Sequence, residues 1–102
     1  MKPAIRSVSA DADIQAALEF YVAEAPHVAE EFVSALEKAV AQIQRQPGIG
    51  SPRYAHELGI PMLRHWSLGR FPYLVFYIEH DDHLDLIRVV HMNRDVPATL
   101  RS

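Results

Sequence analysis

The sequence predicts an α+β fold in which a helical hairpin packs on a twisted, mainly antiparallel sheet, with elements in the order β-α-α-β-β-β. Three observations lead to this prediction. Two successive segments in the first half of the chain carry apolar residues at helical spacing. Three runs rich in apolar, β-branched and aromatic residues fill the second half. Residues 47–52, which hold two prolines and two glycines, separate the halves.

Composition bounds the class of protein. The 102 residues are expected to form a single domain, residues 1–102, with a modest core. Hydrophobic residues at 49% and charged residues at 23% are typical of an ordinary folded protein. The absence of cysteine excludes disulfides, thiolate catalysis and cysteine-ligated zinc. No signal peptide or stretch of transmembrane length is present in the sequence, so we expect a cytoplasmic protein.

The charge is unevenly distributed. A formal net charge of −3 weighs against binding nucleic acid through the phosphate backbone alone. Acids outnumber bases in residues 1–46, whereas most arginines come later. These later arginines are Arg53, Arg64, Arg70, Arg88, Arg94 and Arg101. The sequence therefore allows a local basic surface on a protein that is acidic as a whole.

The first elements are a short strand and a helix. Residues 4–8 alternate weakly and predict the strand. Ser9 is the predicted N-cap of the helix, and Asp11 and Asp13 add negative charge to its first turn. The helix should end near Pro26, because the residue before a proline avoids helical angles. Its apolar residues at helical spacing are Ile14, Ala17, Leu18, Tyr21 and Val22.

A second helix is predicted to begin around Pro26 or His27 and to end before the glycine and proline group at residues 47–52. Its apolar stripe consists of Ala29, Phe32, Val33, Leu36, Val40 and Ile43. The short connection predicts an antiparallel pair with the first helix. Neither helix is apolar all round, so both need a sheet to cover.

The second half of the chain predicts three strands. Residues 53–59 are expected to be irregular, and residues 61–68 to form the first of these strands. Residues 73–80 and 84–92 give the other two, and Pro72 stands where its missing N–H group is tolerated.

The turn between the last two strands sets their register. If Asp81 and Asp82 form a two-residue loop, His80 pairs with His83. The face directed at the helices then carries Leu74, Phe76, Ile87 and Val89. The other, open face carries Tyr73, Val75, Tyr77, Leu86, Arg88 and Val90. A turn longer by one residue would place Arg88 unpaired on the helix side, which is costly, so we favour the first register.

A polar group, His91, Arg94 and Asp95, lies at the end of the last strand. His91 is a candidate general acid or base, because histidine titrates near neutrality. The structural alternative is a hydrogen bond from His91 to Asp95 or to a backbone carbonyl group. The planar fork of Arg94 suits a phosphate or a partner's carboxylate. An Arg94–Asp95 pair that pins the C-terminal tail is compatible with that role.

The aromatic residues of the strands allow two interpretations. Tyr73 and Tyr77 are candidates for stacking on bases or on a partner peptide. Aromatic residues on a sheet more often serve packing alone, and Trp66 is interpreted as an anchor in the sheet.

The hairpin tip has the residue types of a metal site but not the geometry of one. His80, Asp81, Asp82 and His83 follow one another, and Asp85 stands nearby. Adjacent residues of a tight turn point in different directions, which hinders convergence on one ion. We therefore expect neither a metal nor another cofactor.

Local motifs along nearly the whole chain carry a family resemblance. They are Ala10-x-x-Asp13-Ile14, Phe20-Tyr21, Pro47-x-x-Gly50-Ser51-Pro52-Arg53, Phe71-Pro72-Tyr73-x-x-Phe76-Tyr77 and Ile87-Arg88-Val89-Val90-His91-x-x-Arg94-Asp95. In this order and spacing they resemble the RelE/ParE superfamily, the toxins of type II toxin–antitoxin systems. The element order predicted from periodicity agrees with the fold that this resemblance implies.

The resemblance implies one of two targets. RelE-like members cut messenger RNA on the ribosome with clustered basic residues and often a C-terminal tyrosine, histidine or glutamate, whereas ParE-like members lack that set and poison DNA gyrase. Here Lys2 and Lys38 are the only lysines, and no tyrosine follows Tyr77. The His-x-x-Arg-Asp ending is similar to the ParE branch, so the resemblance implies a gyrase inhibitor that acts through a binding surface. Its candidate target-binding residues are Arg88, His91, Arg94 and Asp95.

Two alternatives remain at this point. One is a metal-independent endoribonuclease of the RelE type, whose partners are the ribosome and messenger RNA. Its catalytic residues would be His91, Arg64, Arg88 and Arg94. The other is an inactive relative that only binds an antitoxin.

All these alternatives imply an antitoxin and a toxin–antitoxin hetero-oligomer, with no membrane partner. An antitoxin segment that folds on binding would add a strand at the sheet edge or lay a helix on an exposed apolar groove between the two helices. Its predicted contacts on the open sheet face are Tyr73, Tyr77, Leu86 and Val90.

Overall fold

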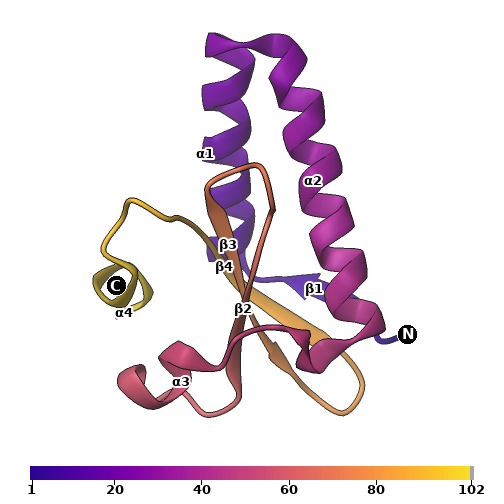
Figure 1. Cartoon of the computed structure of the whole chain (residues 1–102), viewed down its shortest axis with the longest axis vertical. Coiled ribbons are helices and arrows are strands. Elements are labelled where there is room, and N and C mark those ends of the chain that lie inside the picture. Colours follow the sequence, from indigo (N-terminus) through magenta and orange to yellow (C-terminus); the bar gives the residue numbers. More distant parts are fainter. Residues whose placement is uncertain (102) are drawn as a thin grey trace.

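A pair of long helices stands on one face of a four-stranded sheet, and short helices cover part of the other face (Figure 1). This computed structural model describes residues 1–101. The elements are β1 (Ala4–Arg6), α1 (Val8–Glu24), α2 (Pro26–Arg45), the 3₁₀ helix η1 (Pro47–Ile49), α3 (Arg53–Leu58), β2 (Leu63–Ser67), β3 (Tyr73–Glu79), β4 (Leu84–His91) and α4 (Val96–Arg101). The predicted α+β class and the order of the main elements are confirmed.

The first helix begins earlier than predicted. Ser7, not Ser9, is the N-cap of α1, and its Oγ accepts a hydrogen bond from the Ala10 N–H group at 3.0 Å. The Ser7 backbone N–H group also donates to the Leu86 carbonyl oxygen at 2.9 Å. One residue therefore ends the pairing of β1 and starts the helix, which shortens the strand to Ala4–Arg6.

Residues 53–58 form a helix, so the expectation of irregular structure there is wrong. Tyr54, Ala55 and Leu58 of α3 pack on the sheet, and this burial stabilises a helix of only six residues. Gly59 ends it in the left-handed region at φ 66°, which glycine adopts without strain. The C-terminal helix α4 was not predicted either. Its signal was Asp95, whose Oδ1 accepts from the Ala98 N–H group at 3.1 Å.

The sheet has the strand order β1-β4-β3-β2, with β1 parallel to β4 and the other pairs antiparallel. The predicted turn is confirmed, because the His80 N–H group donates to the His83 carbonyl oxygen at 2.8 Å. The register shifts at a β-bulge between Phe76 and Tyr77, where Arg88 rather than Ile87 lies opposite Phe76. The predicted register is therefore wrong beyond the bulge, where Val90 pairs with Leu74.

The main core lies between the helical hairpin and the sheet, and it corrects the predicted faces. Tyr73, Tyr77 and Leu86 pack in or against this core, so they do not lie on an open face. Val90 belongs to a second cluster on the other face, beneath α3 and α4. Both faces of the hairpin are apolar, which is why alternation alone assigned them to the wrong sides.

Candidate functional site

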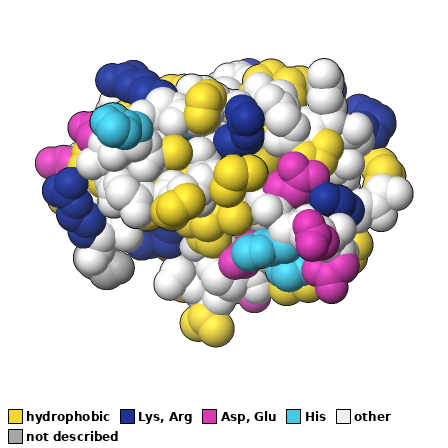
Figure 2. Space-filling model, turned by 90° about the horizontal axis from the view of Figure 1, so that it is seen from below, with side chains coloured by type: hydrophobic (Ala, Val, Ile, Leu, Met, Phe, Trp, Pro, Cys, Tyr) yellow, Lys and Arg dark blue, Asp and Glu magenta, His cyan; other side chains and the backbone are white. Residues whose placement is uncertain are grey.

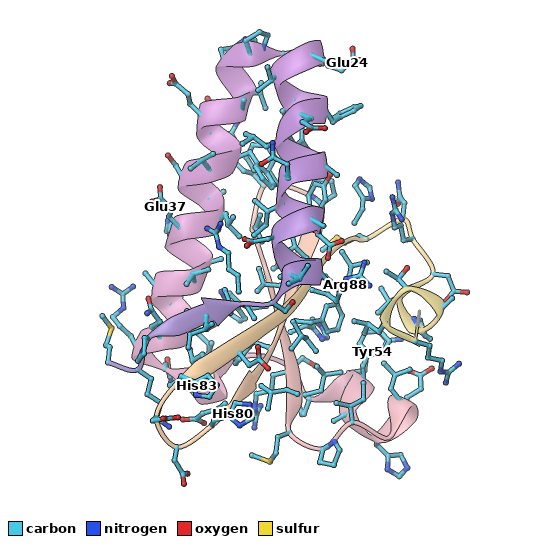
Figure 3. All side chains as sticks on the ribbon, turned by 180° about the vertical axis from the view of Figure 1, so that it is seen from behind. Glu24, Glu37, Tyr54, His80, His83 and Arg88 are labelled. Carbon is cyan, nitrogen blue, oxygen red and sulfur yellow. The ribbon has the colours of Figure 1, made fainter. Side chains whose placement is uncertain are left out.

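Arg88 and Asp13 join α1, β4 and α4 at one point. Arg88 Nε donates to Asp13 Oδ2 at 2.7 Å and Nη2 donates to Oδ1 at 2.9 Å. Arg88 Nη1 also donates to the Thr99 carbonyl oxygen of α4 at 2.9 Å. In Figure 3, Arg88 lies between the first turns of α1 and the C-terminal helix. These bonds to the Asp13 carboxylate raise the pKa of Arg88 above its ordinary value.

The same carboxylate closes an exposed edge of the sheet. β1 pairs with β4 only as far as Leu86. Beyond it, Ser7 Oγ donates to the Ile87 carbonyl oxygen at 2.9 Å, and Asp13 Oδ2 accepts from the Val89 N–H group at 2.9 Å. Side chains of α1 and its cap thus replace a neighbouring strand along this part of β4.

A groove opens beside this junction, and we name it the α1–β4 groove. Its cavity volume is about 450 Å³. One stripe of α1, Asp13, Ala16, Ala17, Phe20 and Tyr21, forms a wall, because these residues recur at helical spacing. The opposite side is lined by Tyr73, Arg88, Val89, Val90, His91, Asn93, Arg94 and Thr99. The floor is mainly apolar and aromatic, and the exposed Arg94 adds positive charge to the rim.

His91 is engaged in the turn that follows β4. The Asn93 N–H group donates to His91 Nδ1 at 3.0 Å, so that nitrogen carries no proton and Nε2 does. The ring packs edge-on against Tyr73, with the ring centroids 5.0 Å apart. The alternative of a bond from His91 to Asp95 or to a backbone carbonyl group is therefore not the observed arrangement. Asp95 instead caps α4.

Tyr73 sits between His91 and the helical hairpin. Its ring contacts Phe32 of α2 with centroids 5.5 Å apart. Burial raises the pKa of Tyr73 most, with a smaller contribution from Tyr21, while Arg94 opposes the shift. The tyrosine is thus neutral at physiological pH and serves as a wall of the groove.

Arg64 lies apart from the groove. Its Nη1 donates to the Gly50 carbonyl oxygen at 2.6 Å and to the Gly48 carbonyl oxygen at 3.3 Å. The structure therefore brings together Arg88, His91 and Arg94 but not the fourth residue of the ribonuclease set.

The four residues predicted to contact an antitoxin do not all lie in the groove either. Tyr73 and Val90 line the groove, whereas Tyr77 and Leu86 are buried in the main core away from it. The Tyr77 hydroxyl group donates to the Pro47 carbonyl oxygen at 2.6 Å and accepts from the Gly50 N–H group at 3.0 Å. These bonds satisfy the hydroxyl group and fix the tyrosine as a structural residue.

Trp66 and the hairpin tip have structural contacts. Trp66 Nε1 donates to Gln42 Oε1 at 3.0 Å, which anchors β2 to α2 as the packing interpretation predicts. The rings of His80 and His83 stack with centroids 4.6 Å apart. Asp82 Oδ1 lies 2.7 Å from His83 Nδ1. Within residues 1–101, no group of three or more histidine and acidic side chains is arranged to hold a metal ion.

Sequence reasoning missed the role of Asp13 and the exposure of Phe20 in the groove. Asp13 was interpreted only as a charge in the first helical turn. A signal was present, because an arginine inside a strand requires a carboxylate, and Asp13 shares a helix face with the buried Ala17. Among the described residues, none of the helices has both the length and the apolar character of a membrane span.

Comparison with known proteins supplies an independent finding. Residues 5–96 match the family model described as the ParE toxin of the type II toxin–antitoxin system, parDE. No curated protein matches the sequence. A solved structure described as the chromosomal ParDE TA system from P. aeruginosa is similar, with 22% identity and a TM-score of 0.75 over 91% of this chain and 98% of that chain. At this identity the structural likeness supports the fold, while the family match extends over most of the sequence.

Proposed function

Since the chain belongs to the ParE toxin family of type II toxin–antitoxin systems, we propose that it inhibits DNA gyrase through a binding surface, without cutting RNA. The observation that carries this proposal is the Asp13–Arg88 pair. Arg88 is the arginine placed inside the last strand, and its guanidinium group is bonded to Asp13 and to Thr99. A cation held in this way fixes the fold and is not available to a phosphate group.

The requirements of a ribonuclease point the same way. RNA cleavage needs a base at the ribose 2′-hydroxyl group, an acid at the leaving oxygen and cations at the phosphate. His91 Nδ1 is occupied by the Asn93 N–H group, and Arg64 is bonded to backbone carbonyl groups elsewhere. Among the described residues 1–101, Arg94 is then the one cation of the proposed set that lines the groove and whose guanidinium group forms no hydrogen bond or ion pair.

Arg94 is the proposed anchor for the gyrase target. It is exposed on the turn after β4, and its backbone N–H group donates to the His91 carbonyl oxygen at 3.0 Å. His91 and Asp95 shape the turn and the start of α4, while Arg88 ties α4 to the sheet. Of the four predicted target-binding residues, His91, Asp95 and Arg88 therefore serve to position Arg94. A cytoplasmic location follows from this target.

The α1–β4 groove is the proposed contact for an antitoxin segment. Phe20, which is 57% exposed, and the partly buried Tyr73 offer apolar surface to a segment that folds on binding. Arg94 at the rim suits an acidic residue of that segment. The similarity to a structure described as a ParDE TA system supports such a partner. Because Arg94 would serve both partners, an antitoxin in the groove would compete with gyrase.

Two activity assays with the purified toxin test the target. We expect inhibition of gyrase supercoiling with trapped cleavage complexes, and no cleavage of messenger RNA on programmed ribosomes. Arg94→Ala should weaken inhibition by roughly tenfold to hundredfold, the value of a hydrogen bond to a charged group. Arg70→Ala is the matched control, because Arg70 is also exposed but lies beside Glu31 of α2. RNA cleavage that disappears in His91→Ala would overturn the proposal.

Calorimetric titration with the antitoxin tests the groove. Ala16→Arg places a bulky cation in the groove from an exposed helical position, and it should weaken binding by at least about tenfold. Val22→Arg is the control, because Val22 is exposed on the same helix but does not line the groove. Equal affinities of the two folded variants would remove the groove as the antitoxin site.

A further inference from the structure

The face of the sheet opposite α1 and α2, which we name the outer face, is only partly covered. The strand registers align Ile5, Asp85, Ile78 and Leu63 in one row across the four strands. Leu63 is buried at one end of the row, beside the fully buried Phe76. Ile5 at the other end is 53% exposed, and Met62, which precedes Leu63, is 64% exposed.

The uncovered part forms an apolar strip. Figure 2 shows hydrophobic side chains gathered in the middle of this view, with histidine, acidic, and Lys or Arg side chains around them. Ile78 and Ile87 are only partly buried here, because the six-residue helices α3 and α4 cover only part of this face. Contiguous apolar surface rimmed by polar groups is typical of an interaction site.

The two ends of the strip carry opposite charge. The hairpin tip contributes Asp82 and Asp85, with His80 Nε2 at 4.0 Å from Asp85 Oδ2, while the nearby Lys2 is already paired with Glu79 at 2.7 Å. The short helices at the other end contribute the exposed Arg53 and Arg101, together with one exposed acid, Glu57 of α3. In Figure 1, α3 and α4 lie on the left of the sheet and the β3–β4 turn lies at its lower right.

Asp85 requires a cation when the strip is covered. It lies within the apolar row, and among the described residues no lysine or arginine forms an ion pair with it. Burying a carboxylate without a charged partner is expensive. The surface that covers this strip must therefore be apolar and must present a cation near Asp85.

We propose that the outer face binds a second copy of this chain in a two-fold symmetric dimer. A two-fold rotation brings the acidic end of one copy to the arginines of the other, and the reverse pairing forms at the same time. A wholly basic partner would match the acidic end and repel Arg53 and Arg101, whereas a second copy matches both ends. The proposal is independent of the gyrase target and leaves the α1–β4 groove open to an antitoxin.

The dimer should be weak and dependent on salt. The strip spans the middle of one face of a molecule whose extents are 37 × 31 × 23 Å, so the interface falls in the small, transient class. We expect a dissociation constant on the order of micromolar at low salt. Raising the ionic strength from about 0.05 M to 0.5 M should weaken it several-fold, because the end-to-end charge pairs are screened.

Sedimentation equilibrium of the full chain with charge-reversed variants tests the pairing. One variant carries Asp82→Lys and Asp85→Lys, and the other carries Arg53→Glu and Arg101→Glu. Each alone places like charges together in both halves of the interface, so self-association should weaken at least about tenfold. A one-to-one mixture restores both attractive pairs and should dimerise as well as the unmodified chain.

Controls separate the interface from folding. Circular dichroism and thermal melting establish that each variant is folded, and Met62→Lys gives a second disruption at an exposed position outside the ladders. Glu24→Lys changes the same kind of charge at the far end of the helical hairpin and should leave the dimer unchanged (Figure 3). A monomeric unmodified chain up to about 0.5 mM, or a mixture of folded variants that stays monomeric, overturns the proposal.

Discussion

The inner and outer faces of the sheet are both apolar, yet they are covered in different ways. On the inner face, the long helices α1 and α2 bury Phe32, Val75 and Tyr77 to 0% exposure. On the outer face, the short helices α3 and α4 bury Phe76 but leave neighbours such as Ile78 partly exposed. Stability is therefore concentrated on the inner face, while part of the apolar surface of the outer face stays exposed.

Buried polar groups differ between the faces as well. The Tyr77 hydroxyl group on the inner face is bonded to both Pro47 and Gly50. On the outer face, His65 Nδ1 is buried and has no hydrogen-bond partner within residues 1–101. The inner face thus uses a satisfied polar group to hold a loop, whereas the outer face carries an unsatisfied one that lowers stability.

The largest difference between the faces should appear on deleting apolar side chains. Phe32→Ala leaves a cavity in the main core and should lower the free energy of unfolding by about 3–5 kcal/mol. Leu58→Ala, at a partly buried position of α3, should cost about 1 kcal/mol. Urea unfolding followed by circular dichroism measures both values. Equal losses would show that the short helices contribute as much stability as the long ones.

The Asp13–Arg88 pair joins the inner helices to the outer helix α4, so breaking it should have the next largest effect. Their side chains are 17% and 20% exposed, and Asp13→Ala should lower the free energy of unfolding by about 2–3 kcal/mol. Arg88→Lys should lose most of the same energy, because an ammonium group cannot make the two-pronged contact. A double-mutant cycle with Asp13→Ala and Arg88→Met isolates the coupling. A coupling near zero contradicts the assigned role.

Gly50 tests how closely the loop after α2 approaches Tyr77 on the inner face. A Cβ atom at Gly50 would lie 2.5 Å from the Tyr77 hydroxyl oxygen and 2.8 Å from the His65 carbonyl oxygen. Gly50→Ala should therefore lower the free energy of unfolding by about 2 kcal/mol through overpacking. Gly48→Ala is the matched control, since nothing lies within 4 Å of its Cβ position. Thermal melting of both variants compares them, and equal melting temperatures would rule out the close approach.

The smallest predicted effect concerns pH and the outer face. Burial, with a smaller contribution from the Arg53 guanidinium group, lowers the pKa of His65 below its ordinary value of 6.5. The unfolded chain then binds a proton here at higher pH than the folded chain, so the free energy of unfolding falls as pH drops below 6.5. His65→Phe should make that decline shallower, because it removes this proton-binding group. Urea unfolding between about pH 5 and 8 measures the slopes, and identical slopes for His65→Phe and the unmodified chain contradict the prediction.

Much of the fold was readable from local sequence. Pro26 opens α2, Ala25 ends α1, and residues 47–52 separate the helices from the strands. The two-residue turn at Asp81 and Asp82 was also readable. These signals are local, because proline, glycine and turn residues restrict their own backbone angles whatever surrounds them.

The candidate site was predicted only in part. His91 and Arg94 do line the α1–β4 groove, since His91 ends β4 and Arg94 follows it in the next turn. Asp13 is 75 residues from Arg88, and no local pattern specifies a partner at that separation. The β-bulge at Ile87 is a second reason why the site was predicted only in part. One extra residue in a strand reverses the faces of all residues beyond it.

Periodicity and breaking residues indicated the two long helices, the four strands and their order, because these signals act over a few positions. Which side of the β3–β4 hairpin meets α1 and α2 depends on the folded arrangement and not on the local pattern. Val75 and Tyr77 on one side and Phe76 and Val90 on the other are equally apolar, so alternation gives no preference. The choice came from contacts between distant segments, such as Tyr77 with the loop at Gly50 and Arg88 with Asp13.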